Sequence, residues 1–174
     1  VVFHTASPFT SNYQDPKRDL IDPALIGTRN VLETAKSFDT VKRVVVTSSC
    51  AAIYTDATEC DLVEGGVLTE AHWNETASPD YQPYSYSKTL AEREAWKIAE
   101  DSPFDLLTAL LQLQVRFGQD YKLPKRAAPK WLVWLLAPFI KLDRKIIANN
   151  VNIEWRADNS KSREVLSIVH FLKH

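Results

Sequence analysis

The chain is poor in several residue types, and each shortage excludes a class of protein. Its longest apolar run, Trp131 to Ile140, has about half of the roughly 20 residues that a membrane-spanning helix needs. Basic and acidic residues nearly balance, at a formal net charge of −1. A dedicated nucleic-acid binder usually has a strongly basic face instead. We therefore expect no membrane and no nucleic acid among its partners.

Cysteine, glycine and methionine are scarce among the 174 residues. The two cysteines, Cys50 and Cys60, have neither a metal-binding nor a redox spacing, so we predict no metal site, a reducing compartment and a cytoplasmic location. The four glycines have no spacing that forms a phosphate-binding loop. There is no methionine, and the first residues already have the composition of a strand. We therefore expect the chain to be a piece of a longer protein.

Strand-like and helix-like segments alternate over the first two-thirds of the chain. The predicted strands are Val1 to Thr5, Val44 to Thr47 and Phe104 to Leu111. The predicted helices run from Asp22 to about Lys36 and from Tyr84 to Asp101. This alternation predicts an α/β fold with a parallel sheet and flanking helices.

Two segments depart from this alternation. The polar stretch Thr55 to Pro83 is too long for a plain connection, which favours a functional or lid-like loop. After about Leu111 the pattern becomes short and helical, with a Trp-rich piece, Trp131 to Leu136, between prolines. Tryptophan near lysine and arginine suits a membrane surface, but the piece is apolar all round, which favours burial.

The most informative stretch begins at Tyr84. Tyr84 and Lys88 are four residues apart and therefore share a helix face, which Ala91, Ala95 and Ile98 continue as a small apolar stripe. A lysine on a core-facing stripe is costly unless its charge is used there. The alternative is that Lys88 extends to solvent at the helix edge and buries only its stem.

Hydroxyl residues follow two of the predicted strands. Thr47, Ser48 and Ser49 end the central strand, and the first strand ends in Thr5-Ala6-Ser7. Ligands of open parallel sheets bind beyond the carboxyl ends of the strands, so these hydroxyls are candidates for ligand contacts. The alternative is that they satisfy loop backbone where a strand stops.

These stretches together resemble the extended short-chain dehydrogenase/reductase superfamily, and within it dihydroflavonol reductases, cinnamoyl-CoA reductases and fungal and bacterial aldehyde-ketone reductases. The matching blocks, in the family's order, are Val2 to Pro8, Gly27 to Leu32, Arg43 to Ser49, Thr69-Glu70 with Trp73-Asn74, and Tyr84 to Glu92. The resemblance implies a partial Rossmann-like sheet. It makes residues 1–111 part of a dinucleotide-binding domain and residues 112–174 a remnant of the substrate-binding portion.

The resemblance also implies a reaction, the NAD(P)H-dependent reduction of an aldehyde, ketone or dihydroflavonol-like carbonyl substrate. It assigns Tyr84 as the proton donor. It makes Lys88 the cation that lowers the pKa of the tyrosine and binds the nicotinamide ribose. Ser49, with Ser48 as the second choice, orients the substrate oxygen.

The implied cofactor is NADP, with NAD as the alternative. By position in the family, Thr5, Ala6 and Ser7 at the end of the first strand run alongside the dinucleotide, and Tyr84 and Lys88 contact it. Two parts of the family pattern are missing. The sequence has no Gly-x-x-Gly-x-x-Gly to seat the pyrophosphate, and a stretch is absent between roughly Ala109 and Phe117.

Two other functions stay open at this point. One is a truncated, non-catalytic family member with a binding role or none. The other is an epimerase or dehydratase of the same superfamily, which shares the Ser, Tyr and Lys set. The missing strands also predict an open sheet edge beside Val1 to Thr5, through which we expect the chain to self-associate.

Overall fold

The structure is a computed structural model and describes residues 1–110, 129–140, 142–158 and 160. It divides the chain into two compact units. The first unit comprises Val1–Thr55 and Ala71–Leu111, and the second comprises Asp56–Glu70 and Gln112–His174. The segment 56–70, expected within the first domain, thus clusters with the C-terminal portion. The expected gap between roughly Ala109 and Phe117 falls almost wholly outside the described residues.

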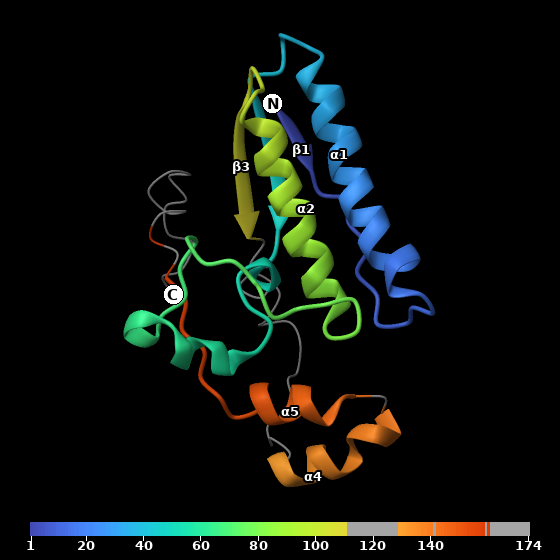
Figure 1. The fold of residues 1–174 in the computed structure, drawn as a ribbon, viewed down its shortest axis with the longest axis vertical. Helices are drawn as coiled ribbons and strands as arrows, with labels where there is room; N and C mark the ends of the chain where they lie inside the picture. The colour runs from blue at the N-terminus through green and yellow to red at the C-terminus, as the bar shows by residue number, and fades with distance from the viewer. Residues whose placement is uncertain (111–128, 141, 159, 161–174) are drawn as a thin grey trace, which may run out of the picture. The chain divides into compact units, whose positions relative to one another are not determined.

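The first unit is built on a three-stranded parallel sheet, β1 (Val2–His4), β2 (Arg43–Ser48) and β3 (Asp105–Leu110), in the order β1-β2-β3. Val45 of β2 is in register with Phe3 on one side and with Leu107 on the other. Each strand lies within or close to its predicted range. The prediction of a parallel α/β sheet is therefore confirmed (Figure 1).

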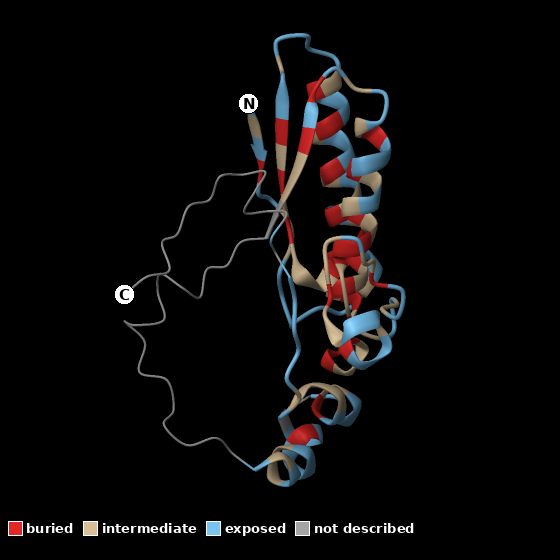
Figure 2. Ribbon diagram, turned by 90° about the vertical axis from the view of Figure 1, so that its left-hand side faces the viewer, coloured by how far each residue is buried: buried red, intermediate tan, exposed pale blue. Residues whose placement is uncertain are grey.

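Two helices, α1 (Asp22–Lys36) and α2 (Pro83–Ala99), pack on the same face of this sheet (Figures 1 and 2). A helical turn, Lys17–Ile21, leads directly into α1. The apolar core between the helices and the sheet consists of Leu32, Ala35, Val44, Val46, Ala95, Ile98, Phe104 and Leu106. The predicted stripe of α2 is confirmed, since Ala91, Ala95 and Ile98 are all buried.

The opposite face of the sheet carries the exposed side chain of Phe3, whose accessible fraction is 70%. Figure 2 shows both helices on one side of the strands, with no described helix of the first unit on the other. Among the described strands, β1 is also an edge, with β2 as its only neighbour. An apolar edge strand can pair with another chain, so self-association stays a prediction.

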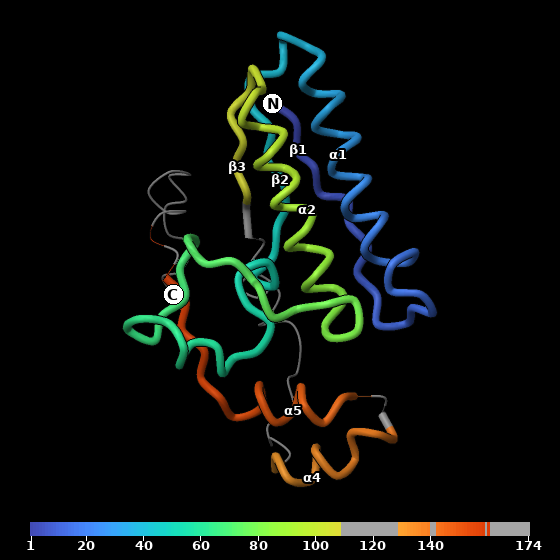
Figure 3. Tube along the Cα trace, viewed as in Figure 1, coloured from blue at the N-terminus to red at the C-terminus, as the bar shows by residue number. Residues whose placement is uncertain are grey.

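The second unit contains short helices, which can be followed along the chain in Figure 3. Two 3-10 helices, Ala57–Leu62 and Glu64–Gly66, occupy the segment predicted as a loop. They are followed, after an undescribed stretch, by α4 (Lys130–Leu136), a 3-10 turn (Ala137–Ile140) and α5 (Arg144–Asn150).

The predicted burial of the Trp-rich piece is wrong for most of its residues. Trp131 is 67% exposed, and Trp134, Leu135 and Leu136 are exposed as well. The helix α4 is seven residues long and packs against the equally short α5, which is too small to cover an apolar surface on every side. Within the part of the chain that the structure describes, no helix has both the length and the apolar character needed to cross a bilayer.

Candidate functional site

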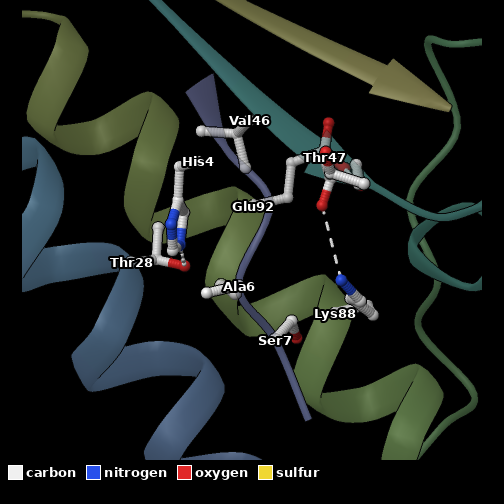
Figure 4. Close-up of a pocket in the computed structure, with 10 residues that line it drawn as sticks. His4, Ala6, Ser7, Thr28, Val46, Thr47, Lys88 and Glu92 are labelled. Atoms are coloured by element: carbon white, nitrogen blue, oxygen red, sulfur yellow. Dashed lines mark hydrogen bonds between the residues drawn. The ribbon is translucent and has the colours of Figure 1, made fainter. Parts of the chain in front are cut away.

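The end of β2 and one face of α2 form the candidate site. The side-chain ammonium of Lys88 donates a hydrogen bond to the carbonyl oxygen of Thr47, at 3.4 Å (Figure 4). Ser49, just beyond the strand, forms a side-chain hydrogen bond with Tyr84 and accepts one from the backbone N–H of Ala51 at 3.2 Å. The structure therefore brings the three predicted catalytic residues together, because Tyr84 and Lys88 lie one turn apart on α2.

Lys88 is buried, with only 7% of its surface exposed. Burial lowers the pKa of its ammonium, and the negative charge of Glu92 opposes that shift. Within the described residues Lys88 forms no ion pair, so its charge is only partly compensated. The alternative in which this lysine reaches solvent at the helix edge is therefore wrong for this structure.

Tyr84 is half-buried in the first turn of α2, which begins at Pro83. The ring of Phe9 packs edge-on against the tyrosine ring with centroids 4.9 Å apart, and Lys88 Nζ lies 5.9 Å from the centroid of the tyrosine ring. Burial raises the pKa of the phenol, while the hydrogen bond with Ser49 opposes this shift and the nearby Cys50 adds to it. The net direction is opposite to the expected lowering, so the phenol stays protonated at neutral pH.

Ser48 and Ser49, the two candidates for the orienting serine, have different partners. The hydroxyl of Ser48 donates a short hydrogen bond to the carboxylate of Glu92, whereas Ser49 contacts Tyr84. Ser48 is also buried on the helix-covered face of β2. The Ser48 hydroxyl thus already donates its proton to Glu92, whereas Ser49 is the serine that contacts the phenol of Tyr84.

A small pocket lies beside this cluster, at the ends of β1 and β2 (Figure 4). Its lining includes Ala6 and Ser7 together with Lys88 and Glu92, whereas Thr5 is exposed and does not line it. The hydroxyl oxygen of Ser7 is buried and has no hydrogen-bond partner among the described residues. A buried hydroxyl without a partner is costly, and a ligand bound in this pocket would satisfy it.

The residues present fit one end of a nicotinamide dinucleotide. The unsatisfied hydroxyl of Ser7 and the ammonium of Lys88 offer hydrogen-bonding groups of the kind that ribose hydroxyls need. No matching group for the pyrophosphate can be named, because the sequence has no glycine-rich loop. The fit is therefore to the nicotinamide-ribose end alone.

Two residues of the site, His4 and Glu92, were not predicted from the sequence. The Nε2 atom of His4 lies 3.1 Å from the hydroxyl oxygen of Thr28, which links β1 to α1 at the wall of the pocket. Glu92 is one turn beyond Lys88. The four-residue spacing that pairs Tyr84 with Lys88 also reaches Glu92, so that spacing was a signal for it.

Comparison with known proteins gives the family. The model of the NAD dependent epimerase/dehydratase family matches residues 1–132, which is most of the chain and includes the whole candidate site. The chain belongs to this family. The resemblance seen in the sequence is therefore confirmed.

Curated relatives match about three-fifths of the chain. The chain is 43% identical over 113 residues to tetraketide alpha-pyrone reductase 2 of Arabidopsis thaliana, an alignment that covers 61% of this chain and 33% of the relative. It is 42% identical over 110 residues to cinnamoyl-CoA reductase CAD2 of Medicago truncatula, with 62% and 33% covered. The chain thus spans about a third of the length of the curated relatives it matches.

Solved structures support the same fold. The yeast methylglyoxal/isovaleraldehyde reductase Gre2, crystallised with NADPH, superimposes with a TM-score of 0.63 at 22% identity, over 95% of this chain and 70% of that one. Another reductase structure has a TM-score of 0.53 at 34% identity, with 61% and 34% covered. The sheet and helices of the first unit therefore have the Rossmann-like arrangement of these reductases.

Proposed function

We propose that this chain carries the proton-donating and nicotinamide-binding side of an NAD(P)H-dependent carbonyl reductase. The observation that carries the proposal is the meeting of Ser49, Tyr84 and the buried Lys88 at the carboxyl end of β2. Relatives named as reductases, one of them crystallised with NADPH, support the reaction class and the cofactor.

In this reaction Tyr84 gives its phenolic proton to the carbonyl oxygen of an aldehyde or ketone. The chemistry that NAD(P)H supplies when bound is a hydride for the carbonyl carbon, so that an alcohol and NAD(P)⁺ result. The phenol of Tyr84 holds its proton at neutral pH, so the side chain is in the form that can donate it. Because its raised pKa also makes the phenol a weaker acid, the transfer requires that the phenolate is stabilised as it forms. Tyr84 regains its proton from solvent afterwards.

Lys88 and Ser49 prepare the tyrosine for this transfer. The ammonium of Lys88, near the ring face of Tyr84, stabilises the phenolate that forms when the proton leaves. Ser49 hydrogen-bonds the same phenol and can turn its hydroxyl toward the substrate oxygen. Ser7 and Lys88 would hold the nicotinamide ribose, since both line the pocket beside the tyrosine.

The test supplies the glycine-rich loop that the sequence lacks. Residues 1–108 replace the matching segment of the Arabidopsis reductase, and consumption of NADPH is followed by absorbance with a panel of aldehydes and ketones. Tyr84→Phe is expected to lower kcat by about 100-fold or more, because the proton donor is lost, while NADPH affinity stays near that of the parent chimera.

The matched control is Tyr86→Phe, which removes the same hydroxyl from a position of α2 two residues before Lys88, on a different side of the helix. This variant should keep the activity of the parent. A folded chimera that binds NADPH but reduces no carbonyl would contradict the proposed function. Equal turnover in Tyr84→Phe and the parent would contradict the role of Tyr84.

A further inference from the structure

Glu92 connects the end of β2 to α2 through its side chain. One carboxylate oxygen accepts the short hydrogen bond from the Ser48 hydroxyl, and the other accepts the indole N–H of Trp96 at 3.3 Å. Ser48 is buried and Glu92 is half-buried, so the Ser48 contact is shielded from water. A charged acceptor makes such a hydrogen bond stronger than a neutral one.

Along the chain at the end of β2, the Ser48–Glu92 contact lies between the Thr47–Lys88 and Ser49–Tyr84 contacts of the candidate site. Thr47–Ser49 contacts α2 at three positions spaced by one turn, since Thr47 meets Lys88, Ser48 meets Glu92 and Ser49 meets Tyr84. We propose that Glu92 is a positioning residue, which fixes the end of β2 through Ser48 and so sets where Lys88 and Tyr84 meet their partners. The catalytic meaning of this proposal rests on the proposed function.

The charge of Glu92 has a second effect on the same site. Glu92 lines the pocket together with Lys88, and its negative charge favours the ammonium form of that lysine against burial. The other titratable groups around Lys88 are Tyr84 on α2 and His4 on β1, and neither carries a negative charge at neutral pH. Among these groups Glu92 is therefore the one whose charge favours the ammonium form of Lys88.

Two substitutions separate the hydrogen bond from the charge. Glu92→Gln keeps an amide that can hydrogen-bond the Ser48 hydroxyl but removes the charge. Ser48→Ala removes the hydroxyl and leaves the carboxylate. The matched control is Glu94→Gln, two residues along α2, where the carboxylate pairs with Arg29 at 2.7 Å instead.

The readout is side-chain NMR of the 174-residue chain, with labelled lysine and tyrosine and the Lys88 signal assigned through Lys88→Arg. We expect a lower pKa of Lys88 in Glu92→Gln than in the wild type, because the favourable charge is lost. In Ser48→Ala we expect no such fall, but shifted ring resonances of Tyr84, because the end of β2 is released. Glu94→Gln should leave both signals unchanged.

A Lys88 titration in Glu92→Gln that overlays the wild type would overturn the electrostatic role. Unchanged Tyr84 resonances in Ser48→Ala would overturn the positioning role, and this arm still decides if Glu92→Gln does not fold. Both readouts are independent of turnover. A chain that positions these groups as described but reduces nothing would therefore contradict the proposed function and leave this inference standing.

Discussion

The two units are stabilised in different ways. The first unit encloses an apolar core in which Leu32, Val44 and Ala95 are completely buried between two long helices and a sheet. Among its described residues, the second unit has short helices and few buried apolar side chains, and polar contacts connect its segments. The carboxylate of Asp56, for example, accepts hydrogen bonds from the side-chain amides of Asn149 at 2.9 Å and Asn150 at 2.7 Å.

This difference indicates where stability and chemistry reside. Burial of apolar surface is the dominant favourable term in folding, so the first unit has the larger source of stability. The candidate site lies entirely within that unit, at the carboxyl ends of β1 and β2 and on α1 and α2. A precise site needs such a rigid support, because small displacements of a catalytic group are costly.

The largest expected effect contrasts the two cores. Leu32→Ala should lower the free energy of unfolding of the first unit by about 3 kcal/mol, because a completely buried side chain leaves a cavity. Ile147→Ala in the second unit also removes a buried side chain but should cost less, since the short helices α4 and α5 can shift to fill the cavity. Denaturant unfolding followed by hydrogen exchange in α1 and α5 measures both, and equal costs would contradict the contrast.

The next effect concerns the polar contacts of the second unit. Asp56→Ala leaves two amide donors without their acceptor and removes the cap of the 3-10 helix Ala57–Leu62, so we expect a loss of about 1–3 kcal/mol. This loss of stability should be measurable as faster hydrogen exchange in α5 and in residues 56–70. Asp61→Ala, at an exposed position of the same 3-10 helix, is the control and should change little.

The local patterns of the sequence were sufficient to predict the first unit. The apolar run of β2, the four-residue spacing of α2 and the proline at the start of each helix are all readable within a few residues. The second unit depends on contacts between distant residues instead, such as Asp56 with Asn150, and on the pairing of Leu68 with Ala157. No local period signals such pairs, so the clustering of the segment 56–70 with the C-terminal portion could not be predicted from the sequence.

The residues of the candidate site show the same contrast between local patterns and contacts of distant residues. Tyr84 and Lys88 were predictable from their spacing, and Ser49 from the family resemblance. The contact between His4 and Thr28 was not, because these residues are 24 positions apart and meet only once β1 and α1 have packed. The direction of the Tyr84 pKa shift also depends on tertiary burial, which outweighs the hydrogen bond with Ser49 in this structure.

A smaller effect is expected from His4 in the first unit. Burial lowers the pKa of its imidazole below 6.5, and the charge of Lys88 lowers it further. The unfolded chain therefore takes up a proton on this histidine at a higher pH than the folded chain does. The stability linked to the neutral imidazole of His4 is thus fully present above pH 6.5 and is lost as the pH falls. Unfolding at several pH values should show a slope in the free energy of unfolding that His4→Gln reduces.

The most direct test of the central claim compares two ligands on the 174-residue chain. We assign only the nicotinamide-ribose end of the cofactor to this chain, through Ser7 and Lys88. Reduced nicotinamide mononucleotide and NADPH, titrated by NMR, are therefore expected to bind with similarly weak affinity, and Lys88→Ala should abolish both. Much tighter binding of NADPH, or binding that is unaffected by Lys88→Ala, would contradict the account.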